Sequence, residues 1–250
     1  MSGPGEFALL VVAGVVAGLI GTAGGITSLV SYPALLAVGL SPLTANVANL
    51  VSLVACWPGS AVSSRRELTG TGRWLAKSLP VAAVASAVGA VVLITTPAGV
   101  FDRVVPVLVA LGSVALLVQP ALTARLRPVA HGASPAAVPL VALVSVYSGY
   151  FGAGAGVLLL AGVLALVDER LPEANAMKNM LNGACTVAAA LVLVFVGPVA
   201  WGAVVPLALG MLAGSTAGPV AARRLPASVV RWAVATFGLI LAVRLALDAR

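Results

Sequence analysis

The sequence predicts an all-α polytopic membrane protein built from two homologous, inverted repeats, each of which starts with a glycine-broken helix. Of its 250 residues, 61% are hydrophobic and only 8% are charged, whereas soluble proteins carry roughly 25% charged residues. The apolar residues form runs of about the 20 residues that cross a bilayer as a helix. Glycine clusters interrupt two of these runs at corresponding places in the two halves. We expect six to eight transmembrane segments.

The first half opens with a run that is too long for one crossing. Residues 7–39 form one apolar stretch, and a continuous helix of that length would measure roughly 50 Å against a hydrocarbon core of about 30 Å. Two short helices joined at Gly21–Gly25 fit better, because glycine permits a sharp turn. Further spans are expected over residues 43–62, 75–94 and 104–118.

The second half repeats this order after a polar linker over residues 121–135. Residues 136–167 are again interrupted by glycines, and helices are expected over 173–196, 199–222 and 228–247. We expect the first repeat with its linker to occupy residues 1–130 and the second repeat residues 131–250. Together they would form one integral membrane transporter domain.

The halves align through glycines, a proline and an asparagine. At an offset of 131 residues, Gly18, Gly21 and Gly25 match Gly149, Gly152 and Gly156; after a one-residue deletion, Pro42 matches Pro172 and Asn49 matches Asn179. Paired glycine-interrupted segments of this kind indicate a transporter site at the repeat interface.

The charge pattern bears on topology. The net charge is +7, and the basic residues cluster at residues 65–77, 125–127 and 223–231, as expected of cytoplasmic loops. If each broken segment crosses the membrane, each half has four crossings and the last cluster faces away from the first. If each segment instead returns to its side of entry, each half has three crossings and all clusters share one side. We favour the second topology, which makes the halves inverted and places both termini outside.

A helix break inside a membrane exposes unpaired N–H groups where the second half-helix begins, and these groups favour an anion. The relevant starts are Gly25–Ile26–Thr27–Ser28 and Gly156–Val157, with hydroxyl donors on Thr22, Thr27 and Ser28. The alternative is that the glycines only allow close helix packing, which we favour for Gly14 and Gly18.

Lys178 lies within an apolar helix, where an ionisable group is costly and usually faces a cavity or a partner; the alternative is that it snorkels to the headgroups. Asn49 and Asn179 either contact a ligand or bridge helices. The predicted substrate-binding residues are Thr22, Gly24, Gly25, Thr27, Asn49, Gly152, Gly154, Gly156, Lys178 and Asn179.

No enzymatic constellation is visible. Cys56 and Cys185 lie in apolar runs without CxxC spacing, which indicates packing rather than a disulfide or metal site. The sequence lacks a catalytic triad and a Walker loop. We therefore expect no enzyme activity, no catalytic residue, no metal and no cofactor. The expected partners are a small anion and the lipid bilayer, without nucleic acid, and the oligomeric state stays open.

The stretch from Gly18 to Leu50, GLIGTAGGITSLVSYPALLAVGLSPLTANVANL, resembles the opening signature of the sulfite exporter TauE/SafE family. The second copy, with Gly152, Gly154, Gly156, Pro172 and Asn179, is similar to that family's repeat. The chain departs from the pattern at Thr22 and Ala23, where further glycines are usual, and at Val47 and Ala48, where a threonine commonly precedes the asparagine. The resemblance implies an inner-membrane transporter of small anions, with sulfite, thiosulfate and organosulfonates among the family's substrates.

We expect a secondary transporter or facilitator that moves a small anion, a sulfur oxyanion or organosulfonate, across the inner membrane, because no nucleotide site is visible. Two alternatives stay open. The first is a transporter of a cation or a neutral solute, since unwound carbonyls and asparagine amides serve those equally. The second is a membrane protein with a structural role and no transport.

Overall fold

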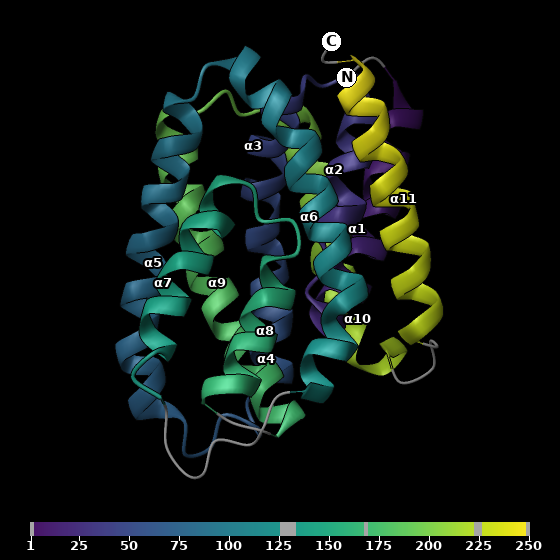
Figure 1. Ribbon diagram of the computed structural model, residues 1–250. Coiled ribbons are helices and arrows are strands. Elements are labelled where there is room, and N and C mark those ends of the chain that lie inside the picture. Colours follow the sequence, from purple (N-terminus) through teal and green to yellow (C-terminus); the bar gives the residue numbers. More distant parts are fainter. Residues whose placement is uncertain (1–2, 126–133, 168–169, 223–226, 249–250) are drawn as a thin grey trace.

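The computed structural model describes residues 3–125, 134–167, 170–222 and 227–248. Every regular element in these residues is a helix (Figure 1). The first half contains α1 (Pro4–Gly24), α2 (Ser28–Ala37), α3 (Pro42–Ser52), the 3₁₀ turn η1 (Leu53–Ala55), α4 (Cys56–Ser63), α5 (Gly72–Thr95) and α6 (Ala98–Arg125). The second half contains α7 (Ala137–Tyr150), α8 (Ala155–Leu166), α9 (Leu171–Val196), α10 (Trp201–Ala222) and α11 (Ala227–Asp248).

The distribution of polar and apolar residues is that of a membrane protein. Within the described residues, five segments are long and apolar enough to cross a bilayer: Pro4–Thr22, Pro42–Val62, Gly72–Thr95, Ala98–Ala121 and Leu171–Val196. Phe195 is 82% exposed and Leu143 71% exposed, whereas Lys178 and Asn49 are fully buried. Apolar side chains outside and polar ones inside suit a lipid environment. The all-α polytopic prediction is confirmed, while the expected number of crossings stays a prediction.

The first glycine break lies between α1 and α2. Gly25 has φ +71°, a conformation that glycine adopts at little cost. Its N–H donates to the Gly21 carbonyl at 2.7 Å and closes the last turn of α1. The predicted break is confirmed, but it begins later than expected, since α1 runs through Gly21 and has 21 residues.

The second break lies between α7 and α8, where Gly152 has φ +78° and Gly154 has φ +77°. The backbone N–H of Ser134 donates to the Leu166 carbonyl at 2.7 Å. This bond joins the start of the α7–α8 hairpin to its end, so the chain returns to the side from which it entered.

The helix directions bear on the two topologies. α1 begins and α11 ends at the same end of the molecule, and the loop with Arg65 and Arg66 lies at the opposite end (Figure 1). Both glycine breaks turn the chain back, as in the three-crossing alternative. Arg127, Arg223 and Arg224 lie outside the described residues. Which end faces the cytoplasm stays a prediction.

The helices of the two halves are intertwined. α1 packs along α10, and α7 packs along α5. A methyl group on Gly18 would lie 2.8 Å from the Ser215 nitrogen, and one on Gly14 would lie 2.9 Å from the Met211 nitrogen. Gly14 and Gly18 therefore serve close packing, as favoured from the sequence. The exchanged pairing is what two inverted repeats would produce, although the repeat relation itself stays a prediction.

Candidate functional site

The two glycine breaks meet in the interior of the molecule. A methyl group on Gly25 would lie 2.7 Å from the Gly156 carbonyl carbon, and one on Gly156 would lie 2.7 Å from the Gly25 Cα. Only glycine at both positions allows this approach. α2 and α8 begin within three residues of this contact, so the positive ends of two helix dipoles converge there.

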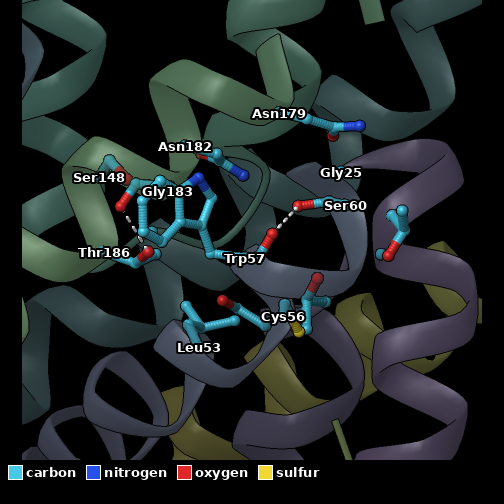
Figure 2. A pocket seen from close by; sticks show the side chains of 15 residues that line it. Gly25, Leu53, Cys56, Trp57, Ser60, Ser148, Asn179, Asn182, Gly183 and Thr186 are labelled. Atoms are coloured by element: carbon cyan, nitrogen blue, oxygen red, sulfur yellow. Dashed lines mark hydrogen bonds between the residues drawn. The ribbon is translucent and has the colours of Figure 1, made fainter. Parts of the chain in front are cut away.

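A cavity of about 50 Å³ lies beside this contact (Figure 2). It is lined by Gly21, Thr22, Gly25, Thr27, Ser28, Leu53, Cys56, Trp57, Ser60, Ser148, Gly152, Asn179, Asn182, Gly183 and Thr186. Most of these side chains are small and polar. Among the described residues that line it, none is a histidine, a lysine or a carboxylate.

Two helix faces supply half of this lining. The α9 face consists of Asn179, Asn182, Gly183 and Thr186, and the facing side of η1 and α4 consists of Leu53, Cys56, Trp57 and Ser60. Both sets have the spacing i, i+3, i+4, i+7, which places their members on one side of a helix. Figure 2 shows the indole ring of Trp57 lying beside Gly183.

The first break adds hydroxyl groups and backbone N–H groups. The Thr22 hydroxyl donates to the Gly18 carbonyl at 2.9 Å. The Ser28 Oγ accepts a bond from Asn49 Nδ2 at 3.1 Å, which leaves the Ser28 proton for another acceptor. Because Thr27 and Ser28 line the cavity at the start of α2, their own backbone N–H groups lie next to it, whereas the N–H groups of Leu29 and Val30 donate to the Ile26 and Thr27 carbonyls at 3.2 and 3.1 Å.

Asn49 holds this region in place. Its Oδ1 accepts a hydrogen bond from the Ser31 hydroxyl at 2.5 Å, while its amide donates to Ser28. The amide of Asn49 is fully buried and does not line the cavity. It therefore fixes α2 against α3 and orients a lining hydroxyl.

Lys178 is fully buried on α9, and its Nζ donates to the Thr22 carbonyl at 3.4 Å. The snorkelling alternative is therefore wrong. Thr22 belongs to the last turn of α1, where the carbonyl groups carry partial negative charge. The amino group of Lys178 therefore serves as a hydrogen-bond donor to that end of the broken helix, behind the cavity.

The carbonyl groups of the second break also have side-chain donors. Asn46 Nδ2 donates to the Tyr150 carbonyl at 2.9 Å, and the Tyr147 hydroxyl donates to the Ala153 carbonyl at 2.6 Å. At the two breaks, the carbonyl groups of Thr22, Tyr150 and Ala153 thus have side-chain donors. The backbone N–H groups of Thr27 and Ser28 belong to residues that line the cavity.

The residues predicted as substrate-binding fall into two groups. Those that line the cavity are Thr22, Gly25, Thr27, Gly152 and Asn179; those that lie behind it are Asn49, Gly154, Gly156 and Lys178. A methyl group on Gly154 would lie 2.9 Å from the Gly112 Cα, so this glycine packs against α6. Gly24 is the last residue of α1, and its surroundings lie outside the described residues. Contact between the ten predicted residues and a substrate stays a prediction.

Several lining residues were not predicted. The α9 face continues from Asn179 through Asn182 to Thr186, and the helical spacing of these polar residues was a usable signal. Trp57 lies against Gly183 at the cavity, and no pattern in the sequence connects these two residues. In the described part of the chain, no cluster of histidine, cysteine or carboxylate side chains is suited to a metal.

Comparison with known proteins agrees with this architecture. The family described as "Sulfite exporter TauE/SafE" matches residues 7–245. The chain belongs to the TauE/SafE family. It is also 26% identical over 250 residues to the "Probable membrane transporter protein ORF9" of Sinorhizobium sp., covering 96% of this chain and 92% of that protein. No solved structure matches the chain. This TauE/SafE member is a multi-pass membrane transporter.

Proposed function

We propose that the protein is a secondary transporter or facilitator that moves a small anion, a sulfur oxyanion or organosulfonate, across the inner membrane. The observation that carries the proposal is the unequal treatment of donors and acceptors at the broken helices. Side chains cover the carbonyl groups of Thr22, Tyr150 and Ala153. The backbone N–H groups of Thr27 and Ser28, at the start of α2, belong to residues that line the cavity.

Electrostatics of the site favour an anion. A helix N-terminus carries roughly half a positive charge, and α2 begins at the cavity while α8 begins beside it. Lys178 adds an ammonium group behind Thr22. Thr27, Ser28 and Asn182 supply donors from the lining itself.

A hard cation finds few charged ligands in this cavity. Carboxylate and carbonyl oxygens bind hard cations, and the described lining residues include the amides of Asn179 and Asn182 but no carboxylate. The lining also lacks a histidine or acid to drive acid–base chemistry, which supports transport without chemical conversion. The family name makes sulfite the first anion to test.

The test compares the two lysines of the chain, Lys178 and Lys77. Lys178→Met removes the buried ammonium group, and Lys77→Met removes an exposed one at the start of α5. A hydrogen bond to a charged group contributes about 1.5–3 kcal/mol. We therefore expect Lys178→Met to lower sulfite flux per inserted protein in proteoliposomes by at least about tenfold, and Lys77→Met to leave it unchanged.

Competition in the same vesicles separates the substrate classes. Sulfite flux should resist excess potassium or sodium ions and fall with excess of a second small oxyanion. Equal flux in the two lysine variants would remove Lys178 from the mechanism. Alkali-cation flux by the unmodified protein, without sulfite flux, would replace the anion proposal with the cation alternative.

A further inference from the structure

Trp57 is the largest side chain that lines the cavity. It lies in the first turn of α4, directly after η1 interrupts the regular helix that began at Pro42. The side chain is 41% exposed, whereas the opposing Gly183 is buried. Trp57 therefore stands at the open side of the cavity, where its ring borders the space left for a substrate.

Gly183 fixes the position of this ring. A methyl group on Gly183 would overlap Cδ1 and Nε1 of Trp57. The indole therefore occupies the place of a side chain on α9, between Asn182 and Thr186 on the same helix face. A larger residue at position 183 would displace the Trp57 ring from its position against α9.

The cavity that remains is small. One water molecule needs roughly 10–15 Å³ of cavity volume, so a cavity of about 50 Å³ has room for roughly three to five water molecules. A space of this size suits one sulfur atom with its oxygens better than an anion that also carries an alkyl tail.

We propose that Trp57, seated on Gly183, sets the upper size limit of the transported anion and restricts it to a compact oxyanion without an organic tail. This inference rests on the proposed anion transport and narrows its substrate class. The polar lining suits this limit, because the hydroxyl and amide groups of Thr27, Ser28 and Asn182 meet oxygen atoms. A hydrocarbon chain would leave these groups unpaired at a cost in free energy.

The test measures flux of sulfite and of butanesulfonate by the full-length protein in proteoliposomes. The unmodified protein should prefer sulfite by at least about tenfold, because pocket size discriminates by such factors. Trp57→Ala should reduce this preference at least about tenfold, and Trp57→Phe should give an intermediate value. Trp201→Ala removes a 52% exposed tryptophan that lies outside the cavity lining, and should leave the preference unchanged.

Cys56 provides a readout that does not depend on flux. Both cysteines are free thiols. Cys56 lines the same cavity as Trp57, whereas Cys185 is buried and its Sγ donates a hydrogen bond to the Ser145 hydroxyl. In a Cys185→Ser background, Trp57→Ala should speed maleimide labelling of Cys56, and sulfate, a compact oxyanion that does not react with maleimide, should slow labelling in the presence of Trp57.

The outcomes separate this inference from the proposed function. Sulfite flux with the same preference in Trp57→Ala, Trp57→Phe and the unmodified protein would overturn the size limit alone. Equal transport of sulfite and butanesulfonate by the unmodified protein would do the same. Absence of flux of either anion, with Cys56 labelling insensitive to sulfate and to butanesulfonate, would overturn the transport proposal and the size limit together.

Discussion

The two glycine breaks share a backbone design but differ in chemistry. Both contain glycines at positive φ, and both precede a short helix that starts near the Gly25–Gly156 contact. At aligned positions, however, Thr22, Thr27 and Ser28 in the first break correspond to Ala153, Leu158 and Leu159 in the second. Three of the hydroxyl groups that line the cavity therefore come from the first break, and those of Ser60, Ser148 and Thr186 come from α4, α7 and α9.

The second break is sealed by apolar packing instead. The rings of Tyr32 and Phe151 lie 5.4 Å apart between centroids, and those of Phe101 and Phe151 lie 6.3 Å apart. All three side chains are buried, and Leu159 joins a separate apolar cluster. The comparison teaches that the glycines create the junction, while the neighbouring side chains decide which break presents hydroxyl groups to the cavity.

A substitution that disrupts the backbone contact between Gly25 and Gly156 should give the largest effect. Gly25→Ala forces an L-residue into a left-handed conformation and brings its methyl group against Gly156. The strain costs about 1–2 kcal/mol, and overpacking costs about 1–3 kcal/mol more. We expect thermal unfolding in detergent to show a loss of about 2–5 kcal/mol and flux to disappear.

Gly39→Ala is the matched control for this prediction. Gly39 also has a positive φ, at +85°, but no atom lies within 4 Å of an added methyl group. Gly39→Ala should therefore lower the free energy of unfolding only by the cost of the left-handed backbone conformation, about 1–2 kcal/mol. Equal destabilisation by the two substitutions would show that the contact between the breaks adds nothing to stability.

Removal of a hydroxyl group at the first break should give the second-largest effect. Thr27→Val keeps the side-chain shape but removes a hydroxyl group from the cavity lining. Loss of one hydrogen bond to an anion, about 1.5–3 kcal/mol, should raise the sulfite concentration for half-maximal flux by roughly tenfold to a hundredfold. Leu158→Val, at the aligned position of the second break, should leave that concentration unchanged. The reverse ranking would assign binding to the second break.

The sequence was sufficient to predict the positions of the breaks and of the following helices. Glycine at Gly25 and Gly154 permits turns that other residues disfavour, and Pro42 and Pro172 lie at the first turn of α3 and α9, where proline is tolerated. These are local effects of single residues on the backbone. They can therefore be read without knowledge of the packing.

The composition of the cavity depended on packing between distant segments. Trp57 meets Gly183, and Lys178 meets the carbonyl of Thr22, across separations that no local pattern encodes. Lys178 was predicted from its cost in an apolar helix, but its partner was not. Asn49 matched Asn179 in the alignment, yet it holds two serines of α2 rather than lining the cavity.

The smallest effect is expected at Asn46, which covers a carbonyl of the second break in the way that Lys178 covers one of the first. Asn46→Leu leaves the Tyr150 carbonyl without its 2.9 Å donor, at a cost of about 1–3 kcal/mol. The same change removes Asn46 Oδ1, a buried oxygen with no partner among the described residues. Removal of this unpaired oxygen should stabilise the folded state by a similar free energy.

Stability of Asn46→Leu should therefore change by less than about 1 kcal/mol, and sulfite flux per inserted protein should stay within about twofold of the unmodified value. Thermal unfolding and flux on one preparation check both expectations. Loss of flux without loss of stability would mean that the second break takes part in binding as directly as the first, which would remove the functional difference between the two breaks.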